Sequence, residues 1–120
     1  MPTSGESPPE IMARFGELAA LAPGADRREV YGHPSCVLRG NMFMGLYEGS
    51  LILRLAEPDR TEFLRRYGGG LFEPLPGRAV KEFVVVPPAL VGTAEIEDWV
   101  RRSFAYAGQL PPREGRSTGR

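Results

Sequence analysis

The sequence predicts an α+β domain in which one antiparallel sheet packs against helices. Three observations support this prediction. Short extended runs are separated by tight turn signals, three other segments carry apolar residues at helical spacing, and no internal repeat is visible. The expected order is helix, three strands, helix, two strands and helix, which makes five strands and three helices. The first three strands form a meander and the last two form a hairpin.

The strongest strand signals lie between residues 33 and 55. Gly40-Asn41 and Glu48-Gly49 are turn pairs, because Gly and Asn tolerate the positive φ that tight hairpins need. These turns predict strands over residues 35–39, 42–47 and 50–55.

The third of these runs has a clear core face, whereas the middle run does not. With a period of two, Leu51, Leu53 and Leu55 share one face. The middle run is apolar on both faces, with Met42, Met44 and Leu46 on one and Phe43 and Tyr47 on the other. A half-solvated strand alternates more cleanly. We therefore expect the second face to be covered either by a helix or by another molecule.

Helices are predicted over residues 10–21, from about Pro58 to Gly68, and over residues 94–106. Proline suits a first helical turn and glycine suits a C-terminal cap, which is the pattern of the second helix. Thr93 is a candidate N-cap for the third.

A second hairpin is predicted around the Pro76-Gly77 turn pair, with strands over residues 71–75 and 79–86. Pro74 has no N–H to donate to a ladder, so the first of these strands should lie at a sheet edge. The second is apolar on both faces and should be central. Residues 25–32 are expected to form a connector, within which the first strand can begin at Val30 and Tyr31.

Composition limits the function classes. Fifteen basic residues balance fifteen acidic ones, which argues against nucleic-acid binding through a strongly basic field. One cysteine excludes an internal disulfide, and no Cys/His spacing indicates a zinc site. No apolar run approaches the ~20 residues of a membrane span, and no signal peptide is visible. We expect a cytoplasmic protein without metal, cofactor or membrane contact.

The domain is expected to span residues 10–108, between two tails. Residues 1–9 are polar and rich in proline, which predicts a disordered N-terminal tail. Residues 109–120 contain three arginines and are predicted to be a flexible C-terminal tail.

No catalytic residue is predicted. His33 and Cys36 are the only histidine and cysteine, and a separation of three on one strand points their side chains to opposite faces. Residues 68–70, Gly-Gly-Gly, follow a helix instead of leading into one, so they do not fit a phosphate loop.

Two sets of residues are candidate contact sites. Met42, Met44 and Ile52 are candidate interface residues, because thioethers fill core gaps and also line adaptable binding surfaces. Periodicity alone leaves burial in the monomer and burial at an interface equally open. The candidates for contact with an anion are Arg65, Arg66, Arg101 and Arg102. They lie in the C-terminal halves of predicted helices, where basic residues are favourable anyway, and a solvated helix face is the default interpretation.

Four segments in succession resemble the TfoX N-terminal domain, the small domain of the TfoX/Sxy regulators of bacterial competence. They are GNMFMGLYEGSLILRL, EPDRTEF, GRAVKEFVVVPP and WVRRSFAYA. The resemblance runs from about Ile11 to Leu110, and its most specific parts are GR-x-x-K-x-F-V-x-VPP and the GNMF hairpin. Residues 31–34, YGHP, depart from the Met-Phe-Gly-Gly-like segment of many members. We expect a stand-alone N-terminal domain without the second domain of the full-length regulators.

The resemblance implies an α+β fold, a bacterial cytoplasmic setting and no enzymatic activity. We therefore predict a non-enzymatic regulatory domain for protein interaction that self-associates, as a homodimer, through sheet or strand surfaces. The alternative is a competence-type transcriptional regulator that contacts DNA or the transcription machinery, although neutral charge and the lack of a recognisable helix-turn-helix weigh against direct DNA contact. A small-molecule binder or enzyme with a pocket near Tyr31, His33 and Cys36 is the third hypothesis.

Overall fold

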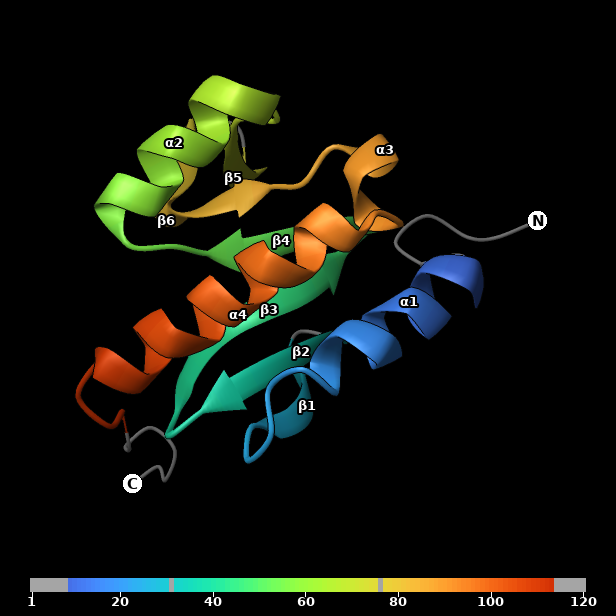
Figure 1. The fold of residues 1–120 in the computed structure, drawn as a ribbon. Coiled ribbons are helices and arrows are strands. Elements are labelled where there is room, and N and C mark those ends of the chain that lie inside the picture. Colours follow the sequence, from blue (N-terminus) through green and yellow to red (C-terminus); the bar gives the residue numbers. More distant parts are fainter. Residues whose placement is uncertain (1–8, 31, 76, 114–120) are drawn as a thin grey trace.

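The computed structural model describes residues 9–30, 32–75 and 77–113, which form one six-stranded antiparallel sheet with helices on one face (Figure 1). In chain order the elements are α1 (Pro9–Ala19), β1 (Asp26–Val30), β2 (His33–Leu38), β3 (Asn41–Tyr47), β4 (Ser50–Arg54), α2 (Glu57–Tyr67), β5 (Leu71–Leu75), β6 (Arg78–Val85), α3 (Pro88–Val91) and α4 (Ala94–Gln109). The strand order across the sheet is β1-β2-β3-β4-β6-β5. The α+β class and the antiparallel sheet agree with the sequence prediction.

The hydrophobic core lies between the sheet and the helices. Helix α4 buries a stripe at helical spacing, which includes Ile96, Trp99, Val100, Ser103 and Ala107. Helix α1 lies beside α4 in Figure 1 and adds Phe15 and Leu18 to the same cluster. From the sheet, the core receives Leu51, Leu53 and Leu55, the face that the sequence had indicated.

A β-bulge in β3 accounts for the two apolar faces of the middle strand. Cys36 of β2 lies opposite Met44, and the next residue, Val37, lies opposite Met42, so Phe43 is left without a partner. Phe43 and Met44 consequently both belong to the helix-side core. The buried Ser103 hydroxyl of α4 donates a hydrogen bond to the Phe43 carbonyl oxygen over 2.8 Å. Helix α4, which covers the bulge, therefore supplies a hydrogen-bond donor to the carbonyl oxygen of the unpaired residue.

The predicted count of five strands and three helices is wrong in two places. Residues 26–30, predicted to be a connector, form β1, which pairs along its whole length with β2. Its sequence, DRREV, lacks apolar alternation because four of its five residues are exposed at the sheet edge. The fourth helix, α3, has four residues, which is too short for a periodic pattern.

The predicted strand positions in the second hairpin are confirmed. Strand β5, which contains Pro74, lies at a sheet edge, and β6 lies between β4 and β5. The turn between β2 and β3 falls one residue earlier than predicted, at Arg39 and Gly40, which both have positive φ (51° and 85°). Pro76 of the predicted turn lies outside the described residues, as do residues 1–8 and 114–120 of the two predicted tails.

Helix α4 continues to Gln109, three residues beyond its predicted end at Tyr106. The segment that follows it is described as far as Arg113, whose backbone N–H donates to the carbonyl oxygen of Arg39. Within the described ranges, no helix has the length and apolar character that crossing a membrane requires.

We predict opposite effects for two glycine-to-alanine substitutions. Gly69 has φ +82°, and a Cβ there would collide with the carbonyl oxygen of Val85. Gly69→Ala should therefore lower the free energy of unfolding by about 2 kcal/mol. Gly16 lies within α1 with open space around it, so Gly16→Ala should raise that free energy by about 0.5–1 kcal/mol. Urea unfolding followed by circular dichroism measures both, and equal effects at the two positions would contradict the prediction.

Candidate binding groove on the open face of the sheet

We call the face of the sheet that is turned away from the helices the open face. This face is strongly curved. Strands β3 and β5 are three positions apart in the sheet, which corresponds to about 14 Å in a flat sheet. Yet the ring centroids of Tyr47 in β3 and Phe72 in β5 are 5.1 Å apart. The β5–β6 hairpin must therefore curl back over the open face.

A row of rings follows this curvature. The ring centroids of His33 and Tyr47 are 4.6 Å apart, Tyr47 contacts Phe72, and the centroids of Phe72 and Phe83 are 6.5 Å apart. The same curvature encloses Ile52, which is only 2% exposed although it points away from the helix-side core. The open face is thus partly closed by the sheet itself.

Two adjoining hollows form one groove across this face. The first, called the apolar end, has a volume of about 470 Å³ and is lined by Val30, His33, Ser35, Met42, Leu46, Tyr47, Ile52, Phe72, Pro74, Val80 and Phe83. The second, called the basic end, has a volume of about 900 Å³ and is lined by Arg28, Val30, Val37, Arg39, Gly40, Met42, Arg54, Val80, Phe83, Pro112 and Arg113. Both hollows include Val30, Met42, Val80 and Phe83, which makes them continuous.

Four arginines line the basic end, and no aspartate or glutamate is among its described lining residues. Arg54 is paired with Glu82 at 2.7 Å, and Arg28 is paired with Asp26 at 3.2 Å. Arg39 instead donates to the carbonyl oxygens of Gly108, at 2.6 Å, and Leu110. These bonds tie the Arg39 side chain to the end of α4.

Glu82 connects the groove to α4. Its burial favours protonation, but hydrogen bonds from Arg54 and from the Tyr106 hydroxyl outweigh burial, so its pKa is lowered. Burial, followed by the hydrogen bond to Glu82, raises the pKa of Tyr106. Glu82 therefore stays ionised at neutral pH and neutralises Arg54. The uncompensated positive charge of the basic end belongs to Arg39 and Arg113, neither of which forms an ion pair with a carboxylate of the described residues.

His33 and Cys36 lie on opposite sides of the sheet, as their spacing predicted. The His33 ring lines the apolar end, whereas Cys36 is buried in the helix-side core. Burial raises the pKa of the Cys36 thiol to about 11, which disfavours the nucleophilic thiolate. The third residue of the hypothetical pocket, Tyr31, lies outside the described residues. The structure thus does not bring a histidine–cysteine pair together.

The candidate interface residues are separated by the bulge. Met42 is half-buried and lines both ends of the groove, and Ile52 lines the apolar end. Met44 lies in the helix-side core and is 0% exposed. The four arginines of the basic end come from distant segments, and no spacing in the sequence indicates that they meet.

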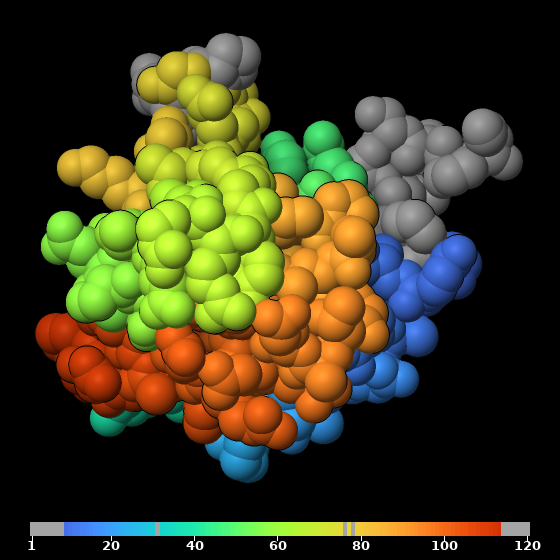
Figure 2. All heavy atoms as spheres, turned by 45° about the horizontal axis from the view of Figure 1, so that its top comes forward, coloured from blue at the N-terminus to red at the C-terminus, as the bar shows by residue number. Residues whose placement is uncertain are grey.

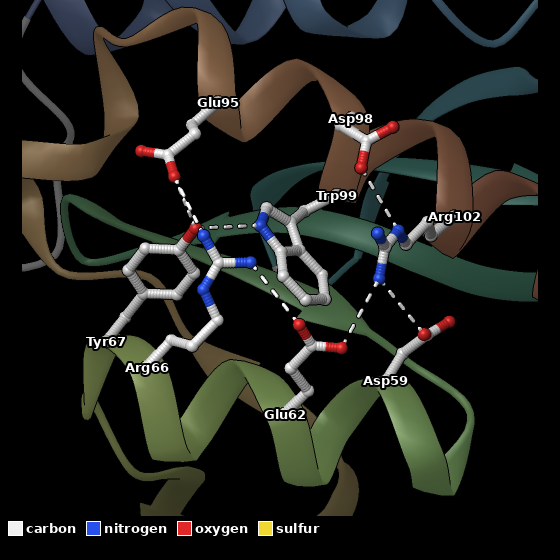
Figure 3. Close-up of polar contacts among 8 residues, drawn as sticks. All are labelled: Asp59, Glu62, Arg66, Tyr67, Glu95, Asp98, Trp99 and Arg102. Carbon is white, nitrogen blue, oxygen red and sulfur yellow. Dashed lines mark hydrogen bonds and ion pairs between the residues drawn. The ribbon is translucent and has the colours of Figure 1, made fainter.

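Two of the four arginines that were candidates for anion contact hold α2 and α4 together around Trp99 (Figure 3). The Arg102 guanidinium lies 4.3 Å from the Trp99 ring centroid and pairs with Asp59, Glu62 and Asp98. Arg66 lies 6.0 Å from that centroid and pairs with Glu62 and Glu95. Trp99 also donates its indole N–H to the Tyr67 hydroxyl. Arg65 and Arg101 are exposed and lie outside this cluster.

No protein-family model matches this chain, and no curated protein or solved structure matches it either. The resemblance to the TfoX N-terminal domain therefore stays a prediction. The groove, the charges around it and the exposed apolar residues carry the functional argument instead.

We predict that Cys36 is unreactive in the folded chain. Because its thiol is buried and its pKa is about 11, a thiol–disulfide exchange reagent at pH 8 should label it only as fast as the chain unfolds. The labelling rate is measured with and without denaturant. Rapid labelling of the native chain would contradict this burial.

We predict that two neighbouring arginines, Arg101 and Arg102, contribute unequally to stability. Arg102→Gln should lower the free energy of unfolding by about 1 kcal/mol, because it removes three ion pairs and the cation–π contact with Trp99. Arg101→Gln removes the same charge from an exposed position and should change it by less than about 0.5 kcal/mol. Urea unfolding at low salt compares the two variants, and an equal loss of stability would contradict the stabilising role of Arg102.

Proposed function

We propose that this chain is a non-enzymatic regulatory domain of the TfoX N-terminal type, which acts in the bacterial cytoplasm by binding a second copy of itself. The observation that supports this proposal best is the position of the exposed large apolar side chains. Among the described residues these are Met12, Leu71, Leu75 and Val80, and the last three lie on the β5–β6 hairpin. In Figure 2 this hairpin projects from the top of the molecule.

The two edges of the sheet differ in the apolar side chains that they expose. The β1 edge carries Asp26, Arg27, Arg28 and Glu29, and charged side chains discourage strand-to-strand association. The β5 edge also contains Glu73 and Pro74, but it exposes two large apolar side chains, Leu71 at 38% and Leu75 at 60%. We call these two leucines the hairpin patch.

Strand alternation keeps the hairpin patch apart from the groove. Phe72 and Pro74 line the apolar end, so Leu71 and Leu75, at the alternate positions of β5, point to the other side. An edge strand is self-complementary about a twofold axis, because the same residues meet in antiparallel order. Met44 and Ile52 have almost no exposed surface, so the hairpin patch takes their place as the proposed contact.

Direct contact with DNA has less support. Arg66 and Arg102 are engaged in ion pairs with four carboxylates, and a guanidinium held in this way offers less charge to a phosphate. The chain also has a formal net charge of zero. Salt-sensitive binding to duplex DNA would favour the transcriptional alternative over self-association.

We predict that two substitutions in the hairpin patch abolish self-association. The wild-type chain should show the mass of a dimer by size-exclusion chromatography with light scattering over a concentration series. The double variant Leu71→Ser/Leu75→Ser should show the mass of a monomer, because it removes the apolar surface that the contact would bury.

Met12→Ser is the matched control for this experiment. Met12 is 44% exposed on α1, so its substitution removes a similar apolar surface outside the hairpin and should leave the dimer intact. Thermal unfolding checks that all variants fold. A wild-type chain that stays monomeric at every concentration would overturn the proposed self-association.

A further inference from the structure

The apolar end of the groove has the size and lining of a small-molecule site. Its volume of about 470 Å³ falls within the range of about 300–1,000 Å³ that is typical of ligand pockets. Its walls are mostly aliphatic and aromatic. Its polar side chains are those of Ser35, His33 and Tyr47: the Ser35 hydroxyl donates to the His33 carbonyl oxygen, and the rings of His33 and Tyr47 pack against each other. These walls favour an apolar group.

Apolar side chains at the junction between the two ends of the groove are partly exposed to water. Val80 is 37% exposed and Met42 is half-buried, and both line the two hollows. Neither side chain belongs to the helix-side core. Removing their apolar surface from water would stabilise a bound molecule that passes between the ends.

The basic end has the charge for one anionic group. Two of its four arginines are neutralised by Glu82 and Asp26, which leaves Arg39 and Arg113. The backbone bond from Arg113 N–H to the Arg39 carbonyl oxygen, at 2.8 Å, holds these two residues together. This approach requires glycine at position 40, where a Cβ would collide with the Arg113 carbonyl oxygen.

The arginine side chains suit a carboxylate. A guanidinium presents its N–H groups in a planar fork that matches the two oxygens of a carboxylate. Arg39 uses one of its terminal nitrogens to bond two backbone carbonyl oxygens, so its other N–H groups are left for a ligand. Because the bonded carbonyls also orient the side chain, less conformational entropy is lost on binding.

We propose that the groove binds an elongated apolar monocarboxylate, such as a medium-chain fatty acid, with its tail in the apolar end and its carboxylate beside Arg39 and Arg113. A neutral apolar molecule would leave the basic end unused. A polyanion would leave the apolar end unused and exceed the available positive charge. This binding site goes beyond the proposed function and does not depend on self-association, because the hairpin patch lies on the other side of β5.

Binding is tested by isothermal titration calorimetry with decanoate below its micelle concentration. We expect one decanoate per chain. Acetate, which has the charge without the tail, should give no binding, and 1-decanol, which has the tail without the charge, should bind at least about tenfold more weakly. The Leu71→Ser/Leu75→Ser variant should bind decanoate like the wild type. This comparison separates a failure of the groove proposal from a failure of self-association.

Three variants test the two ends of the groove. Arg113→Gln should weaken decanoate binding about tenfold, whereas Arg101→Gln, the same change on the exposed face of α4, should leave it unchanged. Val80→Trp places a large side chain at the junction and should abolish binding. Equal affinities for Arg113→Gln and Arg101→Gln, or no decanoate binding by the wild type, would overturn the proposal.

Methyl resonances locate the ligand without any substitution. In NMR spectra of methyl-labelled methionine, decanoate should shift the Met42 signal and leave Met44 and Met12 in place. Met44 is sealed in the helix-side core, and Met12 reports non-specific binding at an exposed apolar site. A shift of Met12 equal to that of Met42 would show surface adsorption and overturn the groove as the binding site.

Discussion

Strand β3 has one residue more than β2 can pair with, and both faces of the domain depend on where that residue goes. Phe43 is the unpaired residue, and it turns toward α4, where Ser103 bonds its carbonyl oxygen. Met44 follows it into the core, while Met42 stays on the open face. One strand therefore supplies the centre of the hydrophobic core and part of the groove floor. Without the bulge, Met42 and Met44 would share a face, as the simple alternation of a strand requires.

The curvature of the sheet converts its open face from a flat surface into a groove. Contact between Tyr47 and Phe72 closes the distance between strands that are not neighbours. Ile52 and Phe83 become buried by this closure, although they lie outside the helix-side core. The alternation of β5 then assigns its residues to two surfaces, with Phe72 in the groove and the two leucines of the hairpin patch facing away. The two proposed activities can therefore be altered independently.

The helix side of the domain is held by a polar cluster as well as by apolar packing. Arg66 and Arg102 approach Trp99 and bond carboxylates from both α2 and α4 (Figure 3). Such exposed pairs each contribute little, but here they share one buried indole and can act together. The sequence alone cannot show this role, because each guanidinium also pairs with a carboxylate of the other helix. The arginines of the groove likewise come together only in the tertiary structure. Arg39 and Arg113 meet because the segment after α4 returns to the β2–β3 turn.

Local chemistry in the sequence was enough to determine the α+β class, the meander, the edge position of the proline-containing strand and the opposite placement of His33 and Cys36. Each of these follows from turn residues, periodicity or a missing N–H, which act within a few residues. The charged edge strand β1 was not predicted, because its sequence has no apolar pattern and the strand is held by backbone pairing with β2. Only the tertiary structure decided which side of the sheet the methionines face, that the open face is hollow, and that its basic end collects arginines from four segments. These features depend on a bulge and on sheet curvature, which arise from contacts between residues far apart in the chain.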